Sequence, residues 1–255
     1  MKEQLYTIPV NDIYNNPCEC PVCAIRLSLD QDGVDFAMGS SYMQDDIRAE
    51  TDKIGFCTKH MRMMYKNGNR LGLALMLDTH LQYINRNVEE MQKLRHFTGG
   101  LFSKKEDGKI YKFTQHIANS CYICDRIGHT FDRYVATIFY LYKNDSAFVK
   151  KFNSGLGYCV EHYGLLYNTA PKYLSGSNLE AFIKALDRIF LENMKRMEAD
   201  VSWFIDKFDY RNSDAPWKTS KDALPRAMTK CNSILDELPE PKSQENPSPS
   251  ESNTQ

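Results

Sequence analysis

The chain has no long apolar run, no excess charge of either sign and little of the residue alternation that is typical of β-strands. Its 255 residues include 32 Lys and Arg against 33 Asp and Glu, which gives a formal net charge of -1. This balance gives no electrostatic reason to expect nucleic acid or an anionic membrane as a partner. Apolar stretches such as 71–77 and 135–141 fall far short of the ~20 residues that span a bilayer. Scarce alternation of Val, Ile and Thr argues against a sheet.

Several signatures of enzymes and of secretion are also missing. The sequence contains no Gly-rich phosphate loop, no G-x-S-x-G and no H-E-x-x-H, so the common nucleotide, hydrolase and metalloprotease motifs are absent. The N-terminus lacks the apolar segment of a signal peptide. We therefore expect a cytoplasmic protein. In a reducing compartment, its eight cysteines indicate metal or redox chemistry rather than structural disulfides.

The chain contains one Cys/His pattern that occurs twice. Each copy has a C-x2-C pair, followed after 33 or 34 residues by a C-x2-H pair. In both copies the second pair is preceded by Gly and an aromatic residue, and a Tyr follows five residues after the His. The eight residues are Cys20, Cys23, Cys57 and His60 in the first copy, and Cys121, Cys124, Cys159 and His162 in the second.

The periodicity of the remaining sequence predicts helices throughout. We predict an all-α fold made of two tandem copies of a small helical unit, residues 1–103 and 104–210, each clipped by its own Cys3His metal site. A charged turn at 104–109 is expected between them. Residues 211–236 are expected to form a linker and a C-terminal helix that packs on the core, and 237–255, rich in Pro, Ser and Glu, a disordered tail. The long helices 71–94 and 179–208 have broad apolar faces, so we expect them to pack across the two copies.

The chemistry of the repeated residues favours zinc. Zn²⁺ prefers a tetrahedron of thiolate and imidazole ligands, and a C-x2-H pair at the start of a helix places both ligands on one face. We therefore expect all eight residues to be metal ligands, with two zinc ions, one per repeat. A closed set of four ligands leaves no position for a reacting water. We accordingly assign no catalytic residue and no other cofactor site, and the sequence favours a protein without enzymatic activity.

Three other interpretations of the cysteines remain open. The C-P-x-C form of the first pair is similar to a thiol redox motif of the glutaredoxin type, although no βαβ pattern surrounds it. A thiolate-rich set can also hold an iron–sulfur cluster, which we rank below zinc. Finally, the cysteines could be buried apolar residues next to a coincidental His.

Residues outside the repeated set are weaker candidates. Cys18 has Asn119 as its counterpart, so it is either a spare thiol or an alternative to Cys20 as a ligand. Cys231 is expected to be a small core residue. Arg26 and Arg126 follow the C-x2-C pairs and are either charge-balancing neighbours of the metal or solvated side chains. The histidines without a matching partner, which we expect to be surface or packed residues, are His80, His96, His116 and His129.

Taken together, the C-P-x-C opening, the G-F-C-x-x-H and G-Y-C-x-x-H helix starts and the closing segments 209–211, 216–217 and 220–224 resemble an uncharacterised bacterial family, found mainly in Firmicutes. The likeness covers about residues 3 to 232. It implies a bacterial cytosolic source and brings no known activity.

Two functions follow as hypotheses. The first is a non-enzymatic, zinc-stabilised binding or scaffold protein that acts on protein partners, without a membrane or nucleic acid. The second is a thiol-based redox sensor or oxidoreductase with Cys18, Cys20 and Cys23 as its reactive group. A DNA-binding regulator is not favoured, because no helix carries a basic stripe. Protection of the thiols until a chelator is added would separate the first hypothesis from the second.

Overall fold

Helices follow one another in the same order in both copies of the sequence pattern. The computed structural model describes residues 5–93 and 103–233, and no β-strand occurs within them, which confirms the all-α prediction. The first copy contains α1 (Thr7–Asn15), α2 (Pro21–Met38), the 3-10 helix η2 (Ser40–Met43), α3 (Asp45–Ile54), α4 (Thr58–Asn67) and α5 (Arg70–Lys93). The second contains α6 (Ser103–Asn119), α7 (Tyr122–Asn144), α8 (Ser146–Ser154), α9 (Val160–Tyr173) and α10 (Gly176–Asp206), followed by η3 (Tyr210–Asn212) and α11 (Ala223–Asn232).

The repeated Cys/His motifs each begin a helix. Cys20, Cys57, Cys121 and Cys159 occupy the N-cap positions of α2, α4, α7 and α9. The second ligand of each motif then lies in the first helical turn. The partial positive charge of a helix N-terminus favours an ionised thiolate there. The sequence therefore places eight metal-ligating side chains at four helix starts before any tertiary contact is made.

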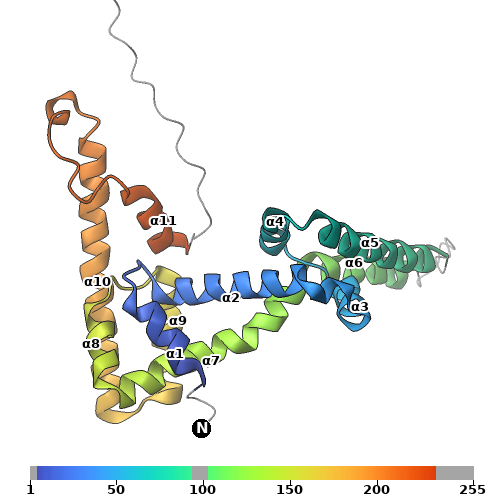
Figure 1. Ribbon diagram of the computed structural model, residues 1–255, viewed down its shortest axis with the longest axis horizontal. Coiled ribbons are helices and arrows are strands. Elements are labelled where there is room, and N and C mark those ends of the chain that lie inside the picture. The colour runs from blue at the N-terminus through green and yellow to red at the C-terminus, as the bar shows by residue number, and fades with distance from the viewer. Residues whose placement is uncertain (1–4, 94–102, 234–255) are drawn as a thin grey trace, which may run out of the picture.

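The centre of the molecule is the pair of long helices α2 and α7, which cross one another (Figure 1). Gly33 lies in the middle of α2, where a glycine weakens a helix by about 1 kcal/mol relative to alanine. A Cβ atom at this position would lie 2.6 Å from Cγ2 of Ile123 and 3.3 Å from Cγ2 of Ile127. The glycine therefore allows the two helices to approach closely, and α2 and α7 join the two copies.

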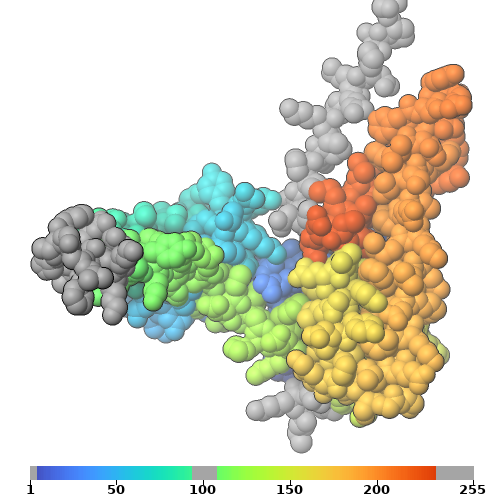
Figure 2. All heavy atoms as spheres, turned by 180° about the vertical axis from the view of Figure 1, so that it is seen from behind, coloured from blue at the N-terminus to red at the C-terminus, as the bar shows by residue number. Residues whose placement is uncertain are grey.

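Two lobes lie at the ends of this central pair (Figures 1 and 2). The α5 lobe consists of α3, α4, α5 and α6, and the α10 lobe of α1, α8, α9, α10 and α11. The leading helix of each copy lies in the lobe of the other: α1 packs on α7 and α8, while α6 packs on α3 and α5. The two copies are thus intertwined, and neither lobe is built from one copy alone.

The α10 lobe has the larger apolar core. Phe139, Phe148, Phe152 and Phe182 are fully buried there, and the rings of Phe152 and Phe182 lie 5.2 Å apart between centroids. Each buried phenylalanine contributes about 1.5–3 kcal/mol relative to an exposed one. In the α5 lobe, α5 buries only four residues of its 24, and α6 buries none of the side chains described. The α5 lobe therefore has less apolar burial to hold it folded.

Two expectations about the chain are wrong. Residues 104–109 belong to α6 and not to a turn, because Lys, Glu and Asp can extend a helix through the single Gly108. The long helices α5 and α10 do not pack across the copies; they lie at opposite ends of the molecule (Figure 1). Their apolar faces are covered by α3 and α6 and by α8, α9 and α11, respectively.

The C-terminal helix α11 packs on α9 and α10. The expected tail, 237–255, lies outside the described residues. Within the described part of the chain, no helix combines the length and apolar character that a membrane-spanning segment requires.

Candidate metal centres

The eight repeated residues form two clusters, but the clusters combine the two copies. Cys20 and Cys23 lie with Cys159 and His162, and Cys57 and His60 lie with Cys121 and Cys124. The prediction of two Cys3His sets is confirmed, and the expectation that each set lies within one copy is wrong. The exchange follows from the crossing of α2 and α7, which brings the start of each beside the C-x2-H helix of the other copy.

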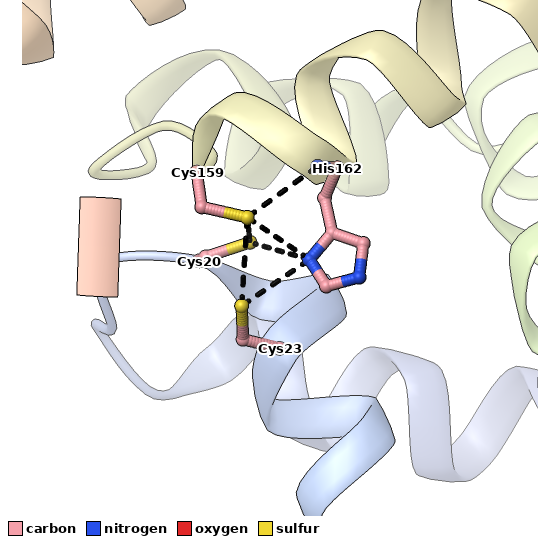
Figure 3. A group of neighbouring side chains, drawn as sticks. All are labelled: Cys20, Cys23, Cys159 and His162. Carbon is pink, nitrogen blue, oxygen red and sulfur yellow. Dashed lines mark hydrogen bonds between the residues drawn. The ribbon is translucent and has the colours of Figure 1, made fainter. Parts of the chain in front are cut away.

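The Cys20 cluster (Cys20, Cys23, Cys159 and His162) joins the N-termini of α2 and α9 (Figure 3). Nδ1 of His162 lies 3.5 Å, 3.2 Å and 3.1 Å from the sulfurs of Cys20, Cys23 and Cys159. The Cys159 sulfur lies 3.8 Å from that of Cys20 and 3.6 Å from that of Cys23. All four side chains are buried.

The Cys57 cluster (Cys57, His60, Cys121 and Cys124) joins the N-termini of α4 and α7. Nδ1 of His60 lies 3.3 Å, 3.2 Å and 3.4 Å from the sulfurs of Cys57, Cys121 and Cys124. The sulfurs of Cys57 and Cys124 are 3.9 Å apart. His60 and Cys121 are buried, whereas Cys57 and Cys124 are half-buried.

These distances fit a tetrahedral zinc ion. With Zn–S of about 2.3 Å and Zn–N of about 2.0–2.1 Å, neighbouring sulfurs in a tetrahedron are about 3.8 Å apart and sulfur and nitrogen about 3.5 Å apart. The observed sulfur–sulfur separations of 3.6–3.9 Å match the first value. They are far longer than the ~2.05 Å of a disulfide bond. The sulfur–nitrogen separations of 3.1–3.5 Å reach the second value only at their upper end. In both clusters the same ring nitrogen, Nδ1, points at all three sulfurs, as metal ligation requires.

The electrostatics of the donor atoms also suit a cation. Burial disfavours the charged form of His60, but the Asp30 carboxylate and the Cys121 thiolate outweigh it and raise the pKa of His60 to about 9. The hydrogen bond from Cys124, with that from His60, lowers the pKa of Cys121 to about 3 despite burial. Hydrogen bonds from Cys20 and Cys23 likewise lower the pKa of Cys159 well below its ordinary value. In the same clusters, hydrogen bonds to Cys159 and to Cys121 raise the pKa of Cys23 and of Cys124, respectively. Each cluster thus favours a thiolate at one cysteine, which its neighbouring thiol and imidazole stabilise by hydrogen bonds.

Asp30 is a functional candidate that the sequence did not reveal. Its carboxylate is fully buried on α2, and Oδ1 accepts a hydrogen bond of 3.0 Å from Nε2 of His60. Lys59 and Arg26 also contact this carboxylate. Burial tends to raise the pKa of Asp30, but these three partners lower it overall. A carboxylate on the far nitrogen of a ligating His fixes the ring and increases its basicity. The matching position in the second copy is Phe131, whose ring packs against His162.

The Cys20 cluster is covered by the C-terminal helix. Oγ of Ser233, which follows α11, lies 3.1 Å from the Cys159 sulfur. Nζ of Lys230 is buried and donates to the backbone carbonyls of Glu19 and Leu156 beside the cluster. Burial lowers the pKa of Lys230. A fully buried lysine next to a C-x2-C pair is not predictable from its position in an amphipathic helix.

The remaining candidates lie outside the clusters. Cys18 is half-buried and lines a cavity of about 380 Å³, while burial and the nearby Cys20 raise its pKa to about 11. Cys231 is exposed, so the expectation of a core residue is wrong. Arg26 reaches Asp30 and thereby the Cys57 cluster, whereas Arg126 lies over the ring of Phe36.

The unpaired histidines behave as expected where they are described. His80 is buried and contacts the backbone oxygen of Asp52 at 2.7 Å. His116 and His129 are exposed. His96 lies outside the described residues.

The fold and the clusters define an all-helical protein with two crossed Cys3His sets. The chain belongs to a family of unknown function (DUF6062), whose model matches residues 1–238. This match confirms the resemblance to an uncharacterised family that the motifs indicated. A search of curated proteins and a search of solved structures each found no match.

Proposed function

We propose that the protein is a non-enzymatic, zinc-stabilised helical scaffold in which each cluster holds one Zn²⁺. The observation that carries this proposal is the geometry of the clusters: three sulfurs and one imidazole nitrogen converge at tetrahedral separations, twice, at helix N-termini. A set of four protein ligands completes the coordination of zinc, which is the arrangement of a structural site and not of a catalytic one.

The crossed pairing gives the ions a specific structural role. Each ion would join a helix of one copy to a helix of the other, α2 to α9 and α4 to α7. The ions would therefore hold the two copies in their intertwined arrangement. Structural zinc contributes on the order of 10 kcal/mol at neutral pH in small domains, which is comparable to the whole stability of an average domain.

We further propose that the scaffold acts in the cytoplasm through contacts with other proteins. The first support is that all eight cysteines are free, which suits a reducing compartment, where disulfides are rare. A second support is the two-lobed shape of the molecule, in which the lobes project from the central helix pair (Figure 2).

The direct test is elemental mass spectrometry on protein purified without a metal-affinity tag. We expect two zinc ions per chain, and we expect His60→Ala/His162→Ala to lose zinc together with thermal stability. Protein without zinc, or with iron and a visible absorbance band, would overturn the proposal.

The unequal cores of the lobes predict a further consequence of metal loss. Both tryptophans of the chain, Trp203 and Trp217, belong to α10 and the segment after it. Cys124→Ser should reduce the helical circular dichroism signal by loosening the α5 lobe while tryptophan emission stays unchanged. Cys23→Ser is the matched control at the same motif position, and it should lose less of the helical signal, because the larger apolar core of the α10 lobe keeps that lobe folded. An equal response of both signals in both variants would contradict the two-lobe account.

A further inference from the structure

The two clusters differ in access to solvent. All four ligands of the Cys20 cluster are buried, with Cys20, Cys23 and Cys159 at most 2 % exposed. In the Cys57 cluster, Cys57 and Cys124 are half-buried. Cys57 and Cys124 are therefore more exposed than their counterparts Cys159 and Cys23, although the ligand sets are chemically the same.

Surface hollows are lined by sequence neighbours of the Cys57 cluster ligands. One of about 560 Å³ is lined by Phe56 and Thr58, the neighbours of Cys57 on either side. Another of about 340 Å³ is lined by Tyr122 and Asp125, which directly follow Cys121 and Cys124 in the sequence. The ligands themselves do not line either hollow, so a small solute meets the Cys57 cluster through the partly exposed side chains of Cys57 and Cys124. In contrast, α11 and Ser233 cover the Cys20 cluster.

We propose that the Cys57 cluster is a redox-sensitive zinc site, oxidised by peroxide at Cys57 and Cys124, while the Cys20 cluster keeps its ion. This inference rests on the proposed function, since it requires zinc in both clusters. A cysteine that coordinates zinc is a thiolate at neutral pH, and the thiolate is the nucleophilic form. With both clusters ionised by the metal, access and not thiol pKa decides which one reacts.

The chemistry uses hydrogen peroxide as the two-electron oxidant. The thiolate of either Cys57 or Cys124 attacks one oxygen of the peroxide and becomes a sulfenic acid. The O–O bond breaks in this step, and the hydroxide that leaves is protonated to water. The second thiolate then attacks the sulfenic sulfur, the S–S bond forms, and a second hydroxide leaves as water. Two protons are consumed overall. The sulfurs start 3.9 Å apart and must close to about 2.05 Å. His60 and Cys121 would then be the two remaining ligands of a zinc ion held there, too few to retain it.

The proposed reactive thiols, Cys57 and Cys124, differ from those of the redox hypothesis drawn from the sequence, which were Cys18, Cys20 and Cys23. The C-P-x-C pair is similar to a redox motif, yet Cys20 and Cys23 are buried under α11 and cannot meet a solute without local opening. The reactive pair instead joins the C-x2-H motif of one copy to the C-x2-C motif of the other.

The test uses full-length protein loaded with zinc, carrying Cys18→Ser and Cys231→Ser to remove the two thiols outside the clusters. Zinc content is measured first, then hydrogen peroxide is added and released zinc is followed with a chromogenic indicator. We expect one ion per chain to leave roughly tenfold or more faster than the other, as thiolate access dictates. Mass spectrometry of the first phase should find a disulfide between Cys57 and Cys124, and dithiothreitol with zinc should reverse it.

Matched single variants identify the cluster behind each phase. Cys124→Ser should abolish the fast phase, and Cys23→Ser, at the same motif position, should leave it. Release of both ions in one phase, a first phase that modifies Cys23 or Cys159, or no release before unfolding would overturn the inference. Protein that holds no zinc before peroxide is added would instead overturn the proposed function.

Discussion

Replacing Asp30 by asparagine should weaken zinc binding at one of the two clusters and leave the other unchanged. The carboxylate accepts the Nε2 hydrogen of His60 at 3.0 Å and is itself fully buried. Asparagine has nearly the same shape and can keep a neutral acceptor, but it removes the negative charge that makes the imidazole a better ligand. The two cations that also contact Asp30 remain solvated, because Arg26 and Lys59 are 34 % and 42 % exposed in their side chains.

The size of the effect can be bounded. Removing such an outer partner of a ligating His reduces metal affinity about 10–100-fold, which equals about 1.4–2.8 kcal/mol. Competition between the protein and a chromophoric chelator of known affinity measures both sites in one titration. We expect two similar affinities in the wild type to separate into one unchanged site and one weakened site in Asp30→Asn.

Asp35→Asn is the matched control, because Asp35 lies on the same helix but is exposed and contacts Gln31 and Asn67. It should leave both sites unchanged. Equal weakening of both sites in Asp30→Asn, or no change at either, would refute the role of the carboxylate in orienting His60.

Two substitutions test the packing around the Cys20 cluster by urea unfolding. Gly157→Ala should destabilise the protein by about 1–3 kcal/mol, because Gly157 has φ 86 and a Cβ there would lie 3.2 Å from Ile189 O. The control is Gly164→Ala within α9, where an added Cβ would have no neighbouring atom within 4 Å. This variant should be neutral or stabilise the protein by up to about 1 kcal/mol. A greater loss of stability in Gly164→Ala than in Gly157→Ala would contradict this account. Lys230→Met should cost about 2–3 kcal/mol, because the backbone carbonyls of Glu19 and Leu156 lose the Lys230 donor. An unchanged midpoint would show that the lysine is dispensable.

Sequence reasoning could predict which residues act together and where helices begin. The Cys and His pairs recur at a fixed offset, and N-terminal helix signals such as Pro21 after Cys20 are local properties of the chain. These features need no tertiary information, so the eight-residue set and the all-α fold were accessible. The exposure of Cys57 compared with Cys159 was not, because it depends on which helix covers each site.

The crossed pairing of the ligands could not be predicted from the sequence. The spacing within the C-x2-C and C-x2-H pairs is the same whether the two pairs of one site come from one copy or from both. A loop of 33 or 34 residues can close within one copy, and loop closure entropy changes slowly with length, so nothing local excludes either arrangement. The one available signal was Gly33 in the middle of a strong helix, which marks a close approach of another backbone. It indicates that α2 has a close helical neighbour without identifying α7.

Zinc content of two double variants that share one substitution tests the central claim most directly. Cys23→Ser/Cys159→Ser removes two ligands of a single cluster, and Cys124→Ser/Cys159→Ser removes one ligand from each. The crossed arrangement predicts that the first variant keeps one zinc ion per chain and that the second keeps none. The reverse result, with one ion retained in Cys124→Ser/Cys159→Ser and none in Cys23→Ser/Cys159→Ser, would show that each site is built within one copy and would contradict the account.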